Sequence, residues 1–143
     1  MKLLLDTNIV LDVLLKRQPY RDFALKIFTW IEKGEISGYL CGTTVTTIDY
    51  IVRKHLGADA AKRCISSLLT IFDIAPVNRS VLLNALALDF PDFEDAVLHE
   101  SANTVSVDGI VTRNLPGFKK SVLPVFGPDE LVMMIIGRSL PSE

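Results

Sequence analysis

The stretch that decides the fold is KLLLDTNIVLDVL, residues 2–14. Residues 2–5 form a short, largely apolar run that ends at Asp6, which is typical of a buried strand. Apolar residues then recur at helical spacing from Ile9 to Leu14. The chain is therefore predicted to turn from strand to helix at residues 6–8, Asp-Thr-Asn.

The rest of the chain alternates in the same way between short apolar runs and longer segments of helical period. This alternation is typical of an α/β fold in which helices cover both faces of a parallel sheet and give three layers. Further strands are predicted at residues 38–41, 72–75, 109–112 and 122–126. Helices are predicted at residues 20–33, 43–55, 58–70, 81–88 and 92–103, with Asp92 as a cap, and from Pro128 onward.

The length and composition predict a single domain over residues 1–143. Domains of roughly 100–150 residues are the commonest size, and here 49% of the residues are hydrophobic and 22% are charged. That balance is typical of a chain with a well-filled core. We expect the chain to fold on its own.

Charge and hydropathy exclude some classes of protein. A formal net charge of -2 argues against a strong non-specific nucleic-acid binder, although bound cations can supply positive charge at an acidic site. No uncharged apolar run approaches roughly 18 residues, and Asp6 interrupts the N-terminal leucines, so no membrane span or signal peptide is expected. Cys41 and Cys64 form no Cys-x-x-Cys motif. We expect a soluble, cytoplasmic protein with reduced thiols.

Acidic and amide side chains fall where a parallel sheet brings distant segments together. Asp6 ends the first strand, and Asn114 follows the strand at residues 109–112. Ligands of such sheets bind outside the carboxyl ends of the strands, near the point where the strand order reverses. Asp92 and Asp95 lie three residues apart on a helix, so their directions differ by about 60° and both can face one pocket. Because Mg²⁺ and Mn²⁺ prefer oxygen ligands, the sequence predicts a divalent-metal site.

The same acids also fit purely structural roles. Asp92 suits a helix cap with Asp95 in the favourable first turn. Asp6 suits an ordinary strand-to-helix turn. Only the joint occurrence of both motifs with Thr-Arg-Asn at residues 112–114 favours a functional site.

Three stretches together resemble the landmarks of the PIN-domain family. They are LLDTNIVLD at residues 4–12, PDFEDA at 91–96 and IVTRN at 110–114, in the order and spacing of that family. The likeness is to a bacterial branch with Asp-Phe-Glu-Asp that is related to toxins of the VapBC kind. The resemblance implies a five-stranded parallel sheet in the order 3-2-1-4-5 and endoribonuclease activity dependent on Mg²⁺ or Mn²⁺. It also implies frequent homodimers and an antitoxin partner.

The resemblance carries over to some residues of this chain and not to others. Asp6 and Asp95 match the first and third acids of the family. The second acid falls on Thr47 when TVTTIDYIVRK, residues 44–54, is aligned by its final five residues. Asp49 would point about 200° away on the helix, so it is a poor substitute and is expected to pair with Arg53. The accompanying polar residues of the family are matched by Asn8, Asp92, Thr112 and Asn114, and Gly117 stands where an acid is common.

The expected function is cleavage of single-stranded RNA by a metal-dependent endoribonuclease, as the toxin of a toxin–antitoxin pair. Asp6 and Asp95 would be the principal metal ligands, and Asp92 would complete the catalytic acids, while the missing charges at Thr47 and Gly117 predict a weakened site. The supporting residues would be Asn8, Thr47, Thr112 and Asn114, and RNA phosphates would be contacted by Arg113, Lys119 and Lys120, near the mouth of the pocket.

Two other functions are open to such a chain. A non-catalytic PIN-fold module that binds RNA or protein is the alternative, because two acidic positions are lost. A small-molecule phosphatase or nucleotide-binding protein is disfavoured, because the chain has no Gly-rich phosphate loop.

Overall fold

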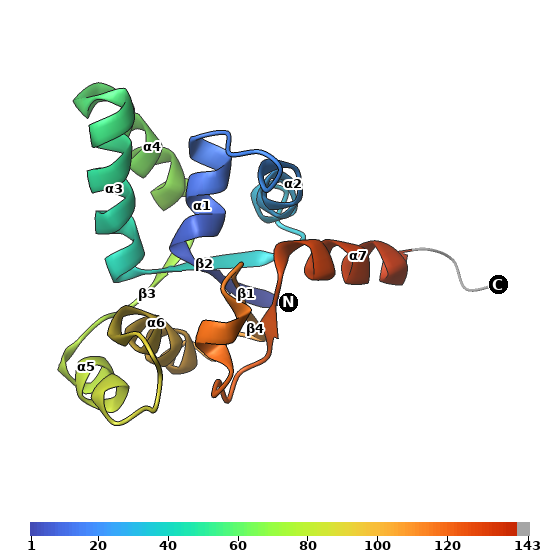
Figure 1. The fold of residues 1–143 in the computed structure, drawn as a ribbon. Helices are drawn as coiled ribbons and strands as arrows, with labels where there is room; N and C mark the ends of the chain where they lie inside the picture. Colours follow the sequence, from blue (N-terminus) through green and yellow to red (C-terminus); the bar gives the residue numbers. More distant parts are fainter. Residues whose placement is uncertain (140–143) are drawn as a thin grey trace.

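The computed structural model describes residues 1–139, which form a five-stranded sheet between two layers of helices (Figure 1). Neighbouring strands pair in parallel in the order β3-β2-β1-β4-β5. The predicted three-layer α/β/α architecture and its strand order are confirmed. The strands are β1 (Lys2–Leu5), β2 (Ser37–Cys41), β3 (Asp73–Ala75), β4 (Gly109–Val111) and β5 (Val125–Phe126).

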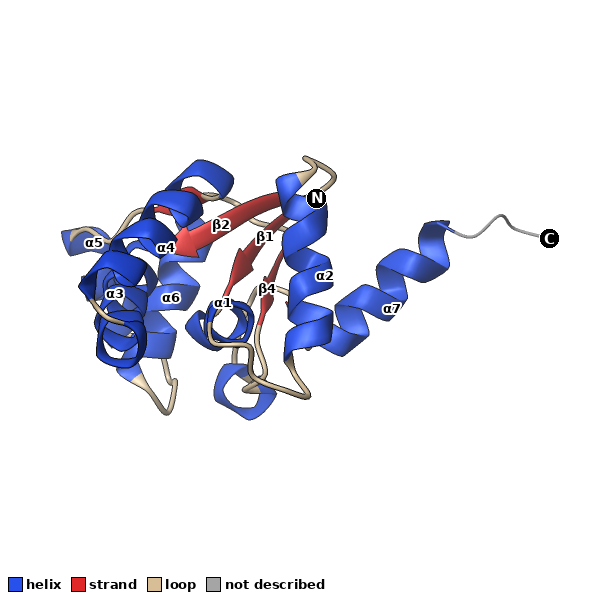
Figure 2. Cartoon of the chain, turned by 90° about the horizontal axis from the view of Figure 1, so that it is seen from above, coloured by secondary structure: helices blue, strands red, loops and turns tan. Residues whose placement is uncertain are grey.

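The helices divide between the two faces of the sheet (Figure 1). One face is covered by α1 (Thr7–Leu14), α2 (Arg21–Glu32), α3 (Gly42–Leu56) and α4 (Ala58–Ile71), and the other by α5 (Arg79–Leu86) and α6 (Phe93–Thr104). The last helix, α7 (Pro128–Ser139), packs on α2 and then projects from the body of the molecule (Figure 2).

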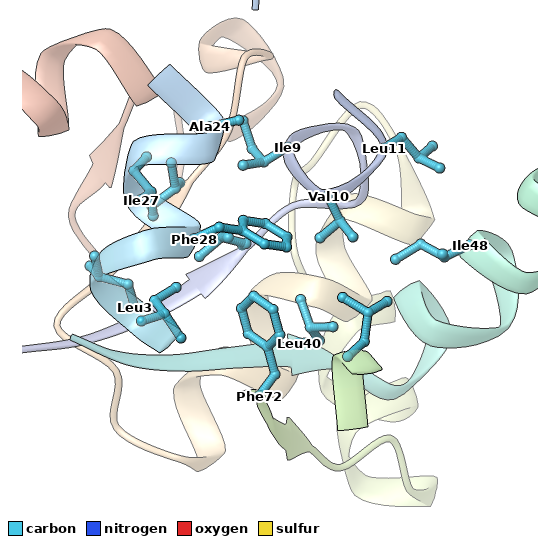
Figure 3. Close-up of a cluster of buried hydrophobic side chains, with 14 of the residues drawn as sticks. Leu3, Ile9, Val10, Leu11, Ala24, Ile27, Phe28, Leu40, Ile48 and Phe72 are labelled. Carbon is cyan, nitrogen blue, oxygen red and sulfur yellow. The ribbon is translucent and has the colours of Figure 1, made fainter. Parts of the chain in front are cut away.

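The core explains why the opening stretch is so apolar. Successive residues of a strand point to opposite faces of a sheet, so Leu3 and Leu5 join one apolar cluster and Leu4 joins the other. All three leucines are fully buried. In the larger cluster, Phe28 of α2 meets the ring of Phe72 edge-on, with centroids 5.2 Å apart (Figure 3). The first strand is thus buried on both faces.

The prediction for the fifth strand is wrong at its start. Residues 122–126 were predicted to be extended and paired, but the paired part is only Val125–Phe126. The Val122 N–H donates instead to the His99 imidazole, at 3.2 Å. Pro124 has no N–H with which to lengthen the ladder, so the strand begins after it.

The strand order reverses between β1 and β4, and the chain continues from both strands at the same edge of the sheet. The Asp6 N–H donates to the Val111 carbonyl, and the Thr112 N–H donates to the Phe126 carbonyl, both at 2.9 Å. These backbone bonds hold Asp6 and Thr112 beside each other. After Thr112 the chain forms a 3-10 helix, Leu115–Phe118, which the sequence pattern did not predict.

Within residues 1–139, no helix combines the length and the apolar character needed to cross a membrane. The single domain over residues 1–143 stays a prediction, and residues 140–143 lie outside the described part.

Candidate functional site

A pocket of about 320 Å³ lies where β1 and β4 end. Its walls come from the start of α1, the middle of α3, the first turn of α6 and the segment after β4. The structure therefore brings Asp6, Asp92 and Asp95 to one place, as predicted. This acidic pocket is lined by Asp6, Thr7, Asn8, Leu11, Thr47, Ile51, Asp92, Glu94, Asp95 and Asn114.

Two hydrogen bonds fix the side chain of Asp6. The Thr7 N–H donates to one carboxylate oxygen and the Thr112 hydroxyl donates to the other, both at 2.7 Å. Burial raises the pKa of Asp6 above its ordinary value, and the charge of Asp92 adds to this. The two hydrogen bonds and the Arg113 guanidinium lower the pKa without cancelling the rise. Asp6 is thus held firmly in a buried place that disfavours its charged form.

The first turn of α6 supplies the other acids. The Asp92 carboxylate caps the helix by accepting the Asp95 N–H at 3.0 Å, so its structural role is confirmed. Burial raises the pKa of Asp95 to about 6, and the charges of Asp6, Asp92 and Glu94 contribute, against a hydrogen bond from Asn114. Asp6 and Asp95, which are remote in sequence, therefore repel each other across the pocket.

Gly117 and Asn114 are packed against each other beside Asp95. The Asn114 amide donates to Asp95 at 3.4 Å. A Cβ atom at position 117 would lie 2.4 Å from the Asn114 amide nitrogen and 3.1 Å from an Asp95 carboxylate oxygen. The absence of a side chain at Gly117 therefore makes room for the amide of Asn114.

The residues of α3 show whether Asp49 can replace the acid that is missing at Thr47. Thr47 lines the acidic pocket, as does Asn8 on α1. Asp49 instead lines a cleft between α3 and α4, where it pairs with Arg53 at 3.2 Å. Asp49 is therefore no substitute for an acid at Thr47, as the helical angle between the two positions predicted.

Arg113 does not line the acidic pocket. It donates two hydrogen bonds to Asp12, at 2.8 and 3.1 Å, and its guanidinium lies 3.8 Å from the ring centroid of Tyr20. The Asp12 side chain is 0% exposed. The Arg113 side chain, which is 27% exposed, is thus engaged with a buried partner outside the acidic pocket, and its contact with RNA phosphate stays a prediction.

The ion pair of Asp12 was not predicted from the sequence. The sequence did contain a sign of this pair, because Asp12 lies at helical spacing from Ile9 and therefore on the buried face of α1. A charge buried there requires an opposite charge nearby. Glu94 was also missed as a wall residue, although it lies within the PDFEDA stretch.

Lys119 and Lys120 lie away from the acidic pocket, on an adjacent one. Lys120 forms an ion pair with Asp89 at 2.7 Å, and both side chains are exposed. Their predicted contact with RNA stays a prediction.

The chemistry of the acidic pocket suits a hard divalent cation. Its donors are carboxylate, amide and hydroxyl oxygens. Burial, with the charges of neighbouring acids, raises the pKa of Asp6 and of Asp95, and a bound cation would stabilise the charged form of each. Within residues 1–139, no group of three acidic, His or Cys side chains is spaced to hold a metal ion by itself. Neutral oxygens would have to complete the set.

Comparison with protein families gives one match. A family model described as PIN domain matches residues 2–116. A search of curated proteins found no match.

Solved structures of bacterial toxin–antitoxin proteins have a similar fold. The VapBC2 complex of Rickettsia felis, bound to a promoter DNA fragment, aligns with a TM-score of 0.67 at 16% identity, over 89% of this chain and 98% of that chain. FitAcB of Neisseria gonorrhoeae aligns with a TM-score of 0.67 at 19% identity, over 88% and 97%. VapC20 of Mycobacterium tuberculosis, a toxin that cleaves the sarcin-ricin loop, aligns with a TM-score of 0.62 at 11% identity, over 76% and 86%. Such identities establish likeness of fold alone.

Proposed function

Because the chain belongs to the PIN-domain family, we propose that it is a metal-dependent endoribonuclease that cleaves single-stranded RNA. The observation that carries this proposal is the meeting of Asp6 and Asp95 in one pocket at the switch point of the sheet. The charge of Asp6 adds to the burial that raises the pKa of Asp95, so the pocket favours a cation.

The residues of the acidic pocket would have different roles in cleavage. In phosphodiester hydrolysis, divalent ions acidify water and stabilise charge on the attacking and leaving oxygens. Asp6, fixed by Thr7 and Thr112, and Asp95 would hold the ions. Asp92 would add charge at the rim while it caps α6. Asn8, Thr47 and Asn114 would orient water through neutral oxygens, which is a common task of groups around a metal.

The toxin–antitoxin complexes among the similar structures support an antitoxin partner for this chain. We include that partner, a homodimer and a cytoplasmic location in the proposal.

A non-catalytic binding module is the second candidate, and a specific observation favours it. Thr47 and Gly117 occupy positions at which acids would add charge to the pocket. Calorimetry with millimolar Mn²⁺ separates the two candidates. Absence of heat together with retained RNA binding would establish the binding module.

The direct test is cleavage of single-stranded RNA with Mn²⁺ and with a chelator. Wild-type protein and Asp49→Asn are expected to cleave with Mn²⁺, because Asp49 lies outside the acidic pocket. Asp6→Asn and Asp95→Asn are expected to be inactive. Equal cleavage by all four proteins would refute the nuclease.

New carboxylates in the wall of the acidic pocket are expected to tighten metal binding. Thr47→Asp is expected to tighten Mn²⁺ binding about tenfold, because it adds a carboxylate to the wall. Gly117→Asp is expected to tighten it less, because its side chain must first displace the Asn114 amide. Calorimetric titration measures both, with Thr46→Asp as a control, since Thr46 lines the α3–α4 cleft instead. Equal affinities for Thr46→Asp and Thr47→Asp would contradict this prediction.

A further inference from the structure

A second pocket, of about 260 Å³, adjoins the acidic pocket. Pro91 in its wall is followed by Asp92, and Pro116 is followed by Gly117, which touches Asn114 and Asp95. Consecutive Cα atoms are about 3.8 Å apart, so the two pockets lie close together at Pro91 and Asp92. This flanking pocket is lined by Asp89, Phe90, Pro91, Pro116, Lys119 and Lys120.

The apolar part of the flanking pocket is rigid. The Phe90 ring packs edge-on against Phe118, with centroids 5.8 Å apart, and against His99 at 5.1 Å. Pro91 and Pro116 have restricted backbones. Such a wall can receive the flat face or edge of a nucleobase without losing much conformational freedom.

The charged part of the flanking pocket complements the acidic pocket. The acidic pocket holds four carboxyl groups, those of Asp6, Asp92, Glu94 and Asp95, and repels phosphate unless a cation intervenes. The flanking pocket carries Lys119 and Lys120 against one acid, Asp89. A strand that crosses both pockets would thus meet positive charge beside the acidic centre.

The two lysines of the flanking pocket differ in their ion pairs. Within residues 1–139, Lys119 forms no ion pair. Lys120 pairs with Asp89, whose side chain is 85% exposed. Exposed pairs of this kind are weak, so a phosphate can replace the Asp89 carboxylate.

We propose that the flanking pocket binds the nucleotide next to the scissile phosphate of single-stranded RNA. The base lies against Phe90 and the two prolines, and Lys119 and Lys120 contact the backbone phosphates. Asp89 competes with RNA for Lys120 and so limits affinity. This inference rests on the proposed function for its substrate class.

Binding of a fluorescein-labelled oligouridylate, measured by anisotropy in EDTA, tests the pocket apart from cleavage. All variants are made in the Asp95→Asn background. Lys119→Gln and Lys120→Gln are each expected to weaken binding about 3- to 5-fold, and the pair about tenfold, with a lower salt dependence. Asp89→Asn is expected to tighten binding about 2- to 3-fold. Lys54→Gln, at an exposed lysine on α3, serves as the control and leaves the affinity unchanged.

The opposite signs at Lys120 and Asp89 make the outcome decisive. If the lysine variants bind like the control while wild-type protein cleaves RNA, the flanking pocket is overturned and the nuclease stands. If binding depends on the lysines but wild-type protein never cleaves with Mn²⁺, the nuclease is overturned and the pocket stands. Tighter binding by Lys120→Gln would also overturn the pocket.

Discussion

Asp95→Asn is expected to lower RNA cleavage at least about a hundredfold and yet to stabilise the metal-free protein at pH 8. The loss of activity should exceed the 10- to 100-fold effect of losing a group that only supports a ligand. The gain in stability arises because Asp95 is ionised at pH 8 beside Asp6 and Asp92, at a cost to the folded state. Asparagine occupies the same space without the charge.

The pH dependence of stability follows from the direction of the shift. The pKa of Asp95 is about 6 in the folded protein and 3.8 for an ordinary aspartate. Between these values the folded state binds a proton that the unfolded state lacks. The contribution of Asp95 to the free energy of unfolding is therefore largest below about pH 4 and is lost as the pH rises through 6. Asp95→Asn should remove about 1 kcal/mol of this decline, a figure reduced for solvent screening of a partly exposed group.

Urea denaturation in EDTA at pH 5 and pH 8, together with an RNA cleavage assay, checks both halves of this prediction. Asp59→Asn is the matched control, because Asp59 also lies in the first turn of a helix, α4, but lines the α3–α4 cleft instead of the acidic pocket. Its effects on cleavage and stability should be small. Unchanged cleavage by Asp95→Asn, or a lower free energy of unfolding than wild type at pH 8, would show that Asp95 lies outside the charged centre.

The opening of the chain was predictable because local and tertiary forces agree there. Residues 3–5 are buried on both faces of the sheet, which requires an apolar run, and the polar residue that follows marks the end of the strand. The cap at Asp92 was equally readable, because capping depends on residues only three apart. The meeting of Asp6 with α6 was predicted from the rule that parallel sheets bind ligands outside the carboxyl ends of their strands, and the strand order itself came from the family resemblance.

Features that depend on contacts across the fold could not be derived from spacing. The role of Gly117 depends on the place of the Asn114 amide, which is set by the 3-10 helix Leu115–Phe118. The hydrogen bond from the Val122 N–H to the His99 imidazole joins two residues that are 23 positions apart in the chain. These contacts cannot be predicted from spacing, because the residues that form them lie far apart in the sequence or on different helices and strands.

The pairing of Arg113 with Asp12 is the clearest contact that the sequence did not predict, because the sequence suggested a different role for Arg113. Its place after Thr112 suggested contact with RNA phosphate. The structure joins it to a fully buried carboxylate on α1 and stacks it on Tyr20. This pair ties the segment that carries Asn114 to the helix that begins at Asp6.

Arg113→Met is therefore expected to lower the free energy of unfolding by about 3–5 kcal/mol, because it leaves a buried charge without its close partner. Arg17 is the remaining cation, and it lies 4.0 Å from Asp12 with 35% of its side chain exposed, so it compensates poorly. The double variant Asp12→Leu with Arg113→Met should recover much of the loss, because an apolar pair avoids the buried charge altogether.

Arg53→Met is the matched control, since its partner Asp49 is 38% exposed, and it should cost less than about 1 kcal/mol. Urea denaturation at pH 7 measures all three variants. Equal losses for Arg113→Met and Arg53→Met, or a double variant less stable than Arg113→Met, would mean that the charge of Asp12 is not confined to the core and that Arg113 is free to meet RNA.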